Sequence, residues 1–159
     1  MAGLVEIRRA DWAEIVDLRH EILRAGLPRS EAIFPGDELS SSRHYGAFVT
    51  LAVQDGSAPR TVGCATFHAS QWQGEPAWQL RGMASALDYR GTGLGRRLLS
   101  RADEDVLADP NASRLLWCNA RVPAVGFYRL LGWDVVSDVF EIPTAGPHVK
   151  MVRRIGERS

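Results

Sequence analysis

Apolar residues recur at helical spacing in two stretches of the chain, and a third stretch is bounded, as they are, by residues that start and stop a helix. The middle stretch is the clearest, because its apolar positions 94, 98, 102 and 106 form one stripe. The limits of these helices are set by an aspartate that can act as N-cap, by a proline that starts a helix, and by glycines or prolines that end one. The predicted helices run between Asp11 and Gly26, between Leu94 and Asp109, and between Pro123 and Gly132.

Alternating or continuous apolar runs predict seven strands around these helices. The runs lie at 4–8, 45–54, 61–69, 77–86, 114–119, 133–142 and 148–155. The turn sequence at 55–57 predicts an antiparallel hairpin between the second and third strands. Residues 71–76 form the next connection, and 143–147 join the last two strands. The length of the chain predicts one domain over residues 1–159, and the order of elements is that of an α/β (α+β) fold.

The segment between Ala25 and Gly46 has prolines, a serine cluster and few apolar residues. It is expected to be a long loop with one helical turn. Long loops in compact domains tend to carry function, which makes its charged residues candidates for an acceptor site, although each alone is typical of a solvated loop. These candidates are Glu31, Asp37, Arg43 and His44.

The amino-acid composition bears on the kind of molecule that the protein can bind. The chain has 159 residues with 19 basic and 19 acidic side chains, so it lacks the net field that attracts nucleic acid or an anionic membrane. Cys64 and Cys118 both fall inside predicted strands, where buried thiols are expected rather than a disulfide framework. The N-terminus lacks a signal-peptide core, and no run approaches the ~18 apolar residues of a membrane helix. We therefore expect a cytoplasmic protein.

The run Arg90-Gly91-Thr92-Gly93-Leu94-Gly95 stands between a predicted strand and the leucine-rich helix. Its glycines leave backbone N–H groups unshielded, and the helix that begins at Leu94 adds the positive end of its dipole. Together with Arg90, Arg96 and Arg97 these groups suit a ligand with several phosphates. Taken alone, the glycine spacing is equally compatible with an ordinary strand-to-helix turn.

Two common phosphate motifs do not fit this run. A P-loop needs Lys-Ser or Lys-Thr after its last glycine, and a dinucleotide fingerprint needs a glycine where Arg96 stands. The run instead resembles the acetyl-coenzyme A signature of the GNAT superfamily of N-acetyltransferases, Arg/Gln-x-x-Gly-x-Gly/Ala, through Arg90, Gly93 and Gly95. In that family the loop amides hold the coenzyme A pyrophosphate.

A second stretch supports the resemblance. Asn119 and the residues 124–133 are similar to the second GNAT signature, Asn-x4-Ala-x-x-Phe-Tyr-x-x-x-Gly-aromatic. Two signatures in the right order are far more specific than one glycine loop. The resemblance covers nearly the whole chain and is sharp between Gln79 and Trp133. It implies a GNAT fold, a mixed and mostly antiparallel central sheet of about seven strands flanked by about four helices.

The resemblance also implies a reaction, acetyl transfer from acetyl-CoA to a primary amine, with no metal. Tyr128 matches the tyrosine that protonates the leaving thiolate in the family, although a tyrosine packed in a largely apolar helix is the structural alternative. Backbone groups of the strand before the loop would line the pantetheine arm and the thioester carbonyl. The implied cofactor-binding residues are Met83, Ala84, Ser85, Arg90, Gly91, Thr92, Gly93, Leu94, Gly95, Arg96, Asn119 and Phe127.

The match departs from the family at the general base. Many members carry a glutamate two residues before the Met83 position, where this chain has Arg81. A relayed water, His148, His44, His68 and Glu75 remain as candidate bases, and His148 has the best case because it begins a strand after a Gly-Pro turn and imidazole titrates in the right range. We place Arg81 and His148 in the acceptor site. Arg81 leads to the hypothesis that the acceptor carries a carboxylate, with Trp72 and Trp78 as an apolar wall.

The acceptor is therefore expected to be a small amine, such as an amino acid or related metabolite, or a protein N-terminus. A catalytically silent GNAT-fold sensor of acetyl-CoA is the alternative that the missing glutamate leaves open. A protein-interaction domain without a cofactor would require the glycine loop to be an ordinary turn. Exposed edge strands make a homodimer a further expectation.

Overall fold

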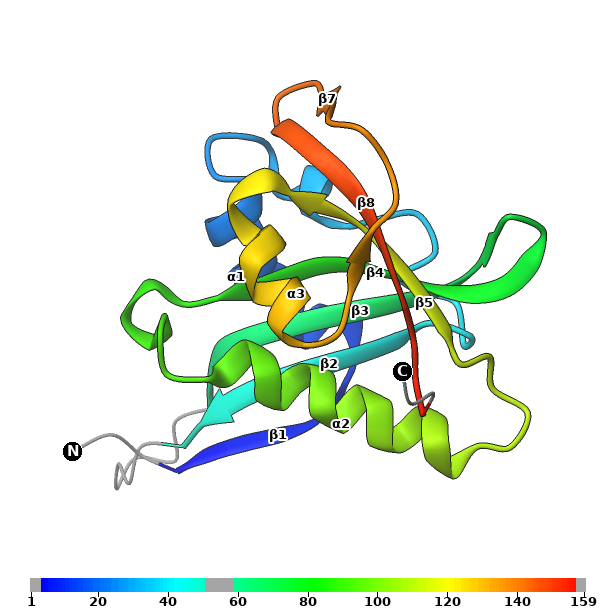
Figure 1. The fold of residues 1–159 in the computed structure, drawn as a ribbon. Coiled ribbons are helices and arrows are strands. Elements are labelled where there is room, and N and C mark those ends of the chain that lie inside the picture. The colour runs from blue at the N-terminus through cyan, green and yellow to red at the C-terminus, as the bar shows by residue number, and fades with distance from the viewer. Residues whose placement is uncertain (1–3, 51–58, 157–159) are drawn as a thin grey trace. The chain divides into compact units, whose positions relative to one another are not determined.

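The structure is a computed structural model that describes residues 4–50 and 59–156 (Figure 1). Its strands are β1 (Val5–Ala10), β2 (Arg43–Val49), β3 (Arg60–Trp72), β4 (Glu75–Ser85), β5 (Leu115–Arg121), β6 (Asp134–Val135), β7 (Phe140–Ile142) and β8 (Gly146–Arg154). Its helices are α1 (Trp12–Leu23), α2 (Leu94–Ala108) and α3 (Val125–Leu130), with short 3-10 helices η1 (Arg29–Ala32), η2 (Leu87–Tyr89) and η3 (Val122–Ala124).

The eight strands form a sheet of order β1-β2-β3-β4-β5-β8-β6, and β7 pairs with β8. The β4–β5 pair is parallel, while the β1–β2, β2–β3, β5–β8, β6–β8 and β7–β8 pairs are antiparallel. This is the mixed, mostly antiparallel α+β sheet that the sequence predicted. The three helices lie where the helical patterns placed them, and η1 is the helical turn expected in the long loop.

Two predicted boundaries were wrong. Residues 71–76 are not a separate connection, because β3 and β4 run on to a tight turn at Gln73 and Gly74, whose positive φ angles of 49° and 80° are typical of a two-residue hairpin. The predicted strand 133–142 is divided into β6 and β7. The Ser137 hydroxyl accepts the Lys150 N–H there at 2.8 Å, so a side chain replaces a backbone partner and interrupts the ladder. The predicted turn at 55–57 lies outside the described residues.

The described chain groups into two compact units, one from residues within 1–68 and 82–104 and the other from residues within 69–81 and 105–159. In the first unit, α1 and α2 cover opposite faces of the β1–β2–β3 strands (Figure 1). On one face, Leu94 and Leu98 of α2 pack so closely that a Cβ on Gly63 would lie 2.9 and 3.1 Å from them. On the other face α1 packs, and Glu14 accepts the Asp11 N–H at 3.0 Å, which confirms Asp11 as its N-cap.

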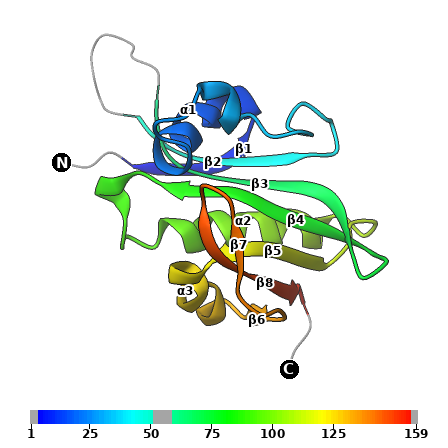
Figure 2. The same cartoon turned by 90° about the horizontal axis from the view of Figure 1, so that it is seen from above.

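The second unit is built on β8, which pairs with β5 along seven residues and also with β6 and β7 (Figure 2). Helix α3 precedes β6 and contacts it. Cys118 on β5 is buried, as is Cys64 on β3 in the first unit, and burial raises the pKa of each thiol to about 12. Both thiols are free and protonated at neutral pH. Within residues 4–50 and 59–156, no helix is both long enough and apolar enough to span a bilayer.

Candidate active site

The glycine loop between η2 and α2 has the backbone conformation of an anion site. Gly91 and Gly93 have φ angles of 76° and 81°, a left-handed conformation that glycine adopts without strain. A Cβ at either position would meet nothing within 4 Å, so the loop is open to a ligand. The Thr92 hydroxyl donates to the Tyr89 carbonyl at 2.6 Å and holds the turn. The loop residues 90–93 are all exposed to solvent.

The start of α2 supplies further donors. The first helical bond at this end runs from the Arg97 N–H to the Gly93 carbonyl at 3.2 Å, so the N–H groups of residues 94–96 precede the helical ladder. Leu94 contributes only its backbone, since its side chain is 3% exposed and packs in the core. Arg90 and Arg96 are exposed beside the loop. The backbone N–H donors, the positive end of the helix dipole and the two arginines together suit the negative charge of a pyrophosphate.

The end of β4, just before this loop, is irregular. Gly82 has φ +62° in the middle of the strand, where positive φ breaks the regular pleat. Its carbonyl accepts the Cys64 thiol at 3.3 Å, and the Ala86 N–H bonds to the Val62 carbonyl at 2.8 Å. Ala84 is buried, whereas Met83 and Ser85 are half-buried. The three residues assigned to the pantetheine arm thus follow a kink in a firmly held strand.

Tyr128 lies in α3, in the second unit, and is 8% exposed. Its ring makes edge contacts with Phe127 and Trp133, at centroid distances of 5.1 and 5.4 Å. Burial raises the pKa of its phenol above the ordinary value, and the nearby Cys118 thiol acts in the same direction. The phenol is therefore protonated at neutral pH, which is the state that a general acid needs.

Asn119 and Phe127, the other members of the second signature, have different surroundings. Phe127 is 36% exposed at the surface of α3. Asn119 lies on β5 opposite Lys150 of β8, and its Oδ1 accepts the lysine Nζ at 3.2 Å. The lysine Nζ also lies 4.9 Å from the Trp117 ring centroid and 5.3 Å from that of Phe140. Asn119 is thus part of a basic and aromatic group on the β5–β8 face.

Arg81 and His148, predicted for the acceptor site, lie in the second unit on β4 and β8, the two strands that pair with β5 on either side. Arg81 is half-buried on β4. His148 is 4% exposed on β8, opposite Arg121 of β5, and its Nδ1 lies 2.8 Å from the Gly146 carbonyl oxygen. Because a carbonyl only accepts, Nδ1 carries the proton and Nε2 the lone pair. A tilted contact with Phe140 holds the ring.

A buried polar network in the first unit was only partly visible in the sequence. Arg19 of α1 is fully buried, and its Nη1 donates to Asp37 Oδ2 at 2.6 Å and to the Ala32 carbonyl at 2.8 Å. Asp37, a predicted loop candidate, is 2% exposed and also accepts the Phe34 N–H at 2.8 Å. Arg19 was missed. The available signal was its helical spacing, since position 19 falls on the same face as Ile15.

Two histidines complete this network. His68 on β3 lies with Nε2 3.0 Å from Asp37 Oδ1. His44 on β2 has both ring nitrogens engaged, Nδ1 with Thr66 Oγ1 and Nε2 with the Asp37 carbonyl, each at 2.8 Å. Arg19 Nη2 in turn donates to Thr66 Oγ1 at 2.7 Å. Burial disfavours the Asp37 carboxylate, but the hydrogen bonds from His68 and Arg19 outweigh it and hold the pKa of Asp37 well below its usual range.

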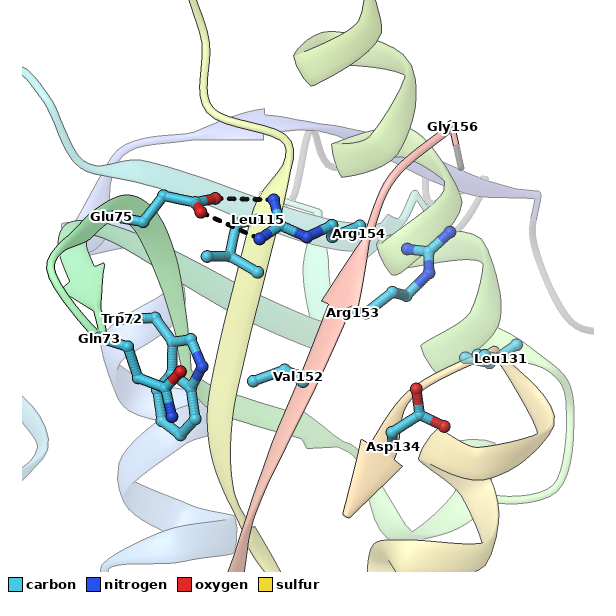
Figure 3. Close-up of a pocket in the computed structure, with 11 residues that line it drawn as sticks. Trp72, Gln73, Glu75, Leu115, Leu131, Asp134, Val152, Arg153, Arg154 and Gly156 are labelled. Atoms are coloured by element: carbon cyan, nitrogen blue, oxygen red, sulfur yellow. Dashed lines mark hydrogen bonds and ion pairs between the residues drawn. The ribbon is translucent and has the colours of Figure 1, made fainter. Parts of the chain in front are cut away.

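The second unit also contains an open cleft of about 640 Å³ (Figure 3). Its rim carries Glu75, whose carboxylate pairs with both terminal nitrogens of Arg154 at 2.7 and 3.0 Å. This pairing lowers the pKa of Glu75 and makes it a poor candidate base. Trp72 lines the cleft, and its ring lies 5.6 Å from that of Trp117. Within the described ranges, no group of three or more His, Cys, Asp or Glu side chains is placed to hold a metal ion.

Comparison with known proteins identifies the class. Residues 10–133 match the Acetyltransferase (GNAT) family. The chain is 30% identical over 154 residues to the uncharacterized N-acetyltransferase YitI of Bacillus subtilis (strain 168), an alignment that covers 96% of this chain and 97% of the relative. The family match and this relative together identify the chain as an N-acetyltransferase, a class of acyltransferase. The chain belongs to the GNAT acetyltransferase family, whose members use acetyl-CoA.

Solved structures agree at the level of the fold. ElaA from Escherichia coli superposes with a TM-score of 0.70 at 18% identity, covering 95% of this chain and 100% of ElaA. An aminoglycoside 6'-N-acetyltransferase complexed with coenzyme A superposes with a TM-score of 0.68 at 16% identity, covering 97% of this chain and 99% of that one. At such identities the likeness shows the shared fold alone.

Proposed function

We propose that the protein transfers an acetyl group directly from acetyl-CoA to the primary amine of a small acceptor that bears a carboxylate. The observation that carries this proposal is the open loop at Gly91 and Gly93, which leads into the N-terminus of α2. Its backbone donors and the exposed Arg90 and Arg96 fit the pyrophosphate of coenzyme A. The coenzyme A bound to a protein of the same fold supports the same ligand.

Three demands of this reaction can be assigned to residues of the chain. The amine must lose a proton, the developing oxyanion needs a donor, and the leaving thiolate gains from an acid. We assign the oxyanion donor to the backbone of Met83, Ala84 and Ser85, which follows the kink at Gly82. We assign the acid to Tyr128, whose buried phenol stays protonated. Asn119 and Phe127 are assigned to the pantetheine arm.

A carboxylate on the acceptor is supported by the basic face of the β4–β5–β8 strands. Gln79 pairs with Trp117 in the parallel β4–β5 register, so Arg81, two residues further, projects on the same face. Lys150 lies on that face over Trp117. Cations beside aromatic rings suit a carboxylate with an apolar or aromatic body. Amino acids and peptides with a nearby carboxylate are therefore the first acceptors to test.

The decisive experiment is thermal unfolding with and without acetyl-CoA for the parent and for Gly93→Asp. The variant places a carboxylate in the loop and forces a non-glycine residue into the left-handed backbone conformation of Gly93. Gly74→Asp is the matched control, because Gly74 has φ +80° and equally open surroundings but lies in the β3–β4 turn. We expect acetyl-CoA to stabilise the parent and Gly74→Asp by several degrees and to leave Gly93→Asp unchanged.

Other outcomes separate the alternatives. Equal stabilisation of Gly93→Asp would refute the loop as the cofactor site. Stabilisation without release of coenzyme A thiol, over a panel of amino acids and peptides, would make the protein a sensor of acetyl-CoA instead. No stabilisation of the parent would refute acetyl-CoA as the ligand.

A further inference from the structure

We propose that His68, positioned by Asp37, is the base that takes the proton from the acceptor amine. This inference rests on the N-acetyltransferase function proposed above and concerns the one demand that the family pattern leaves unassigned here, since Arg81 replaces the usual glutamate. His68 would act by touching the amine or one water bound to it, and Asp37 would act through His68.

The first observation is the pairing of His68 with a buried carboxylate. Asp37 Oδ1 lies 3.0 Å from His68 Nε2, and the Asp37 side chain has no exposed surface. The other oxygen, Oδ2, is held by Arg19 and by the Phe34 N–H. A carboxylate fixed at both oxygens orients the imidazole and stabilises the imidazolium that forms when the ring takes a proton.

The second observation concerns the tautomer. An ionised carboxylate only accepts, so His68 Nε2 carries the proton and Nδ1 carries the lone pair. Nδ1 has no hydrogen-bond partner among the described residues, and the side chain retains 11% of its surface in contact with solvent. His44 differs, because both of its nitrogens are occupied and burial lowers its pKa. Of the two histidines in the network, His68 alone has a nitrogen available to accept a proton.

The third observation is that the network packs against the part of β4 that lies in the same unit. The Arg19 side chain packs under Gly82, where an added Cβ would lie 2.6 Å from Nε. Gly82 immediately precedes Met83, to which the thioester carbonyl is assigned. The Arg19 Nε is itself buried without a partner among the described residues. The charged and titratable groups around His68 are Arg19 from α1, Asp37 from the loop before β2, and His44 from β2, whose ring centroid lies 6.5 Å away.

The proposed step balances as follows. His68 Nδ1 first takes a proton from the acceptor ammonium, and the neutral amine nitrogen then forms a bond to the thioester carbonyl carbon. The tetrahedral intermediate then breaks its C–S bond, and the thiolate receives the Tyr128 proton. The nitrogen loses a second proton as the amide forms, and this proton restores the Tyr128 phenol through solvent. His68 releases its proton to solvent after the products leave. No oxidant, metal or further co-reactant is required.

His148 is the rival base, since its Nε2 is also available. Its Nδ1 is held by a neutral carbonyl, however, and a carbonyl stabilises an imidazolium less than a carboxylate does. The test compares His68→Gln, His148→Gln and the control His20→Gln, which removes an imidazole bonded to the Leu27 carbonyl at the end of α1. Each is assayed with acetyl-CoA and a panel of amino acids and short peptides across pH.

We expect His68→Gln to lower kcat/KM by about 100-fold or more at neutral pH. The loss should shrink as the pH approaches the pKa of the acceptor amine, because an amine that is already neutral needs no base. A structural defect would lower the rate at every pH alike. Acetyl-CoA should stabilise His68→Gln against heat as it stabilises the parent.

The tautomer provides a second readout that needs no acceptor. The chain has four histidines, so ¹⁵N spectra of histidine-labelled protein are simple to assign with the same variants. We expect His68 as the Nε2–H tautomer in the parent and a change in Asp37→Asn, with at least a tenfold loss of kcat/KM. An Nδ1–H tautomer for His68, or a pH-dependent loss that follows His148→Gln instead, would overturn the assignment while leaving the acetyltransferase intact. A parent that does not bind acetyl-CoA, or acetylates none of the panel, would overturn both.

Discussion

Arg19 and Asp37 form a salt bridge in which neither side chain has any surface exposed to solvent. Arg19 Nη1 lies 2.6 Å from Asp37 Oδ2, although the residues are 18 positions apart in the chain. The Phe34 ring covers the guanidinium at 4.2 Å. Such a pair is costly to bury and more costly to break, because the remaining partner becomes an uncompensated charge. The pair therefore ties α1 to the loop that orients His68.

Arg19→Met should destabilise the protein by about 3–5 kcal/mol, since it leaves Asp37 buried without its cation. The matched control is Arg29→Met, which breaks an exposed pair of similar length, Arg29 Nε to Asp17 Oδ1 at 2.7 Å. That change should cost at most about 1 kcal/mol. Urea unfolding of the parent and both variants provides the comparison. Equal losses of unfolding free energy in the two variants would contradict the claim that burial makes the Arg19–Asp37 pair costly to break.

Stability should also depend on pH through Asp37. Its pKa is lower in the folded protein than the ordinary value near 3.8, so the folded state holds fewer protons than the unfolded state in that range. The stabilisation is complete above pH ~4. It is lost progressively as the pH falls from there toward the depressed pKa of the folded state. Asp37→Asn should be less stable at neutral pH and should show a flatter decline below pH ~4. Parallel curves for the two proteins would refute the assignment.

Gly82→Ala should destabilise the protein more than Gly74→Ala. Both glycines have positive φ, 62° and 80°, so both variants pay a left-handed strain of about 1–2 kcal/mol. A Cβ on Gly82 would also meet the Arg19 Nε at 2.6 Å, whereas one on Gly74 would meet nothing within 4 Å. The additional loss should be about 1–3 kcal/mol, as for other overpacked sites. Thermal or urea unfolding measures it, and equal losses would mean that Arg19 moves aside freely.

Tyr128→Phe should lower kcat by about 10²–10⁴-fold and leave acetyl-CoA binding unchanged, because it removes the phenolic acid but keeps the packed ring. Tyr45→Phe is the control, since Tyr45 is also buried, at 0% exposure, and packs on Phe67. That variant should retain the parent kcat. Release of coenzyme A thiol measures both. A Tyr128→Phe enzyme with full activity would leave Tyr128 as a packing residue.

Arg81→Ala should act on the choice of acceptor. Loss of a charged hydrogen bond to a carboxylate costs roughly 1.5–3 kcal/mol, which is about a ten- to hundredfold loss in kcat/KM. We expect that loss for amines with a carboxylate and little change for amines without one. Arg114→Ala, at an exposed position just before β5, should change neither. A uniform effect of Arg81→Ala on all amines would remove the proposed carboxylate site.

Local signals made the glycine loop and the helix boundaries predictable. The glycines of the loop need positive φ and an open surrounding, and both are local properties that a sequence motif records. Asp11 as an N-cap and the α2 leucine stripe were predictable for the same reason. The interruption between β6 and β7 was not, because it depends on Ser137 bonding to Lys150, a contact between strands that local pattern does not encode.

The sequence by itself determined the family, the glycine loop that we propose for the cofactor, the candidate acid Tyr128 and the absence of a glutamate at position 81. Spacing alone did not separate His44, His68 and His148 as bases. Tertiary structure distinguishes their imidazoles, because the state of an imidazole depends on which group meets each nitrogen, and those groups come from distant parts of the chain. Asp37 is 31 residues from His68 along the chain, yet its Oδ1 lies 3.0 Å from Nε2 of that ring.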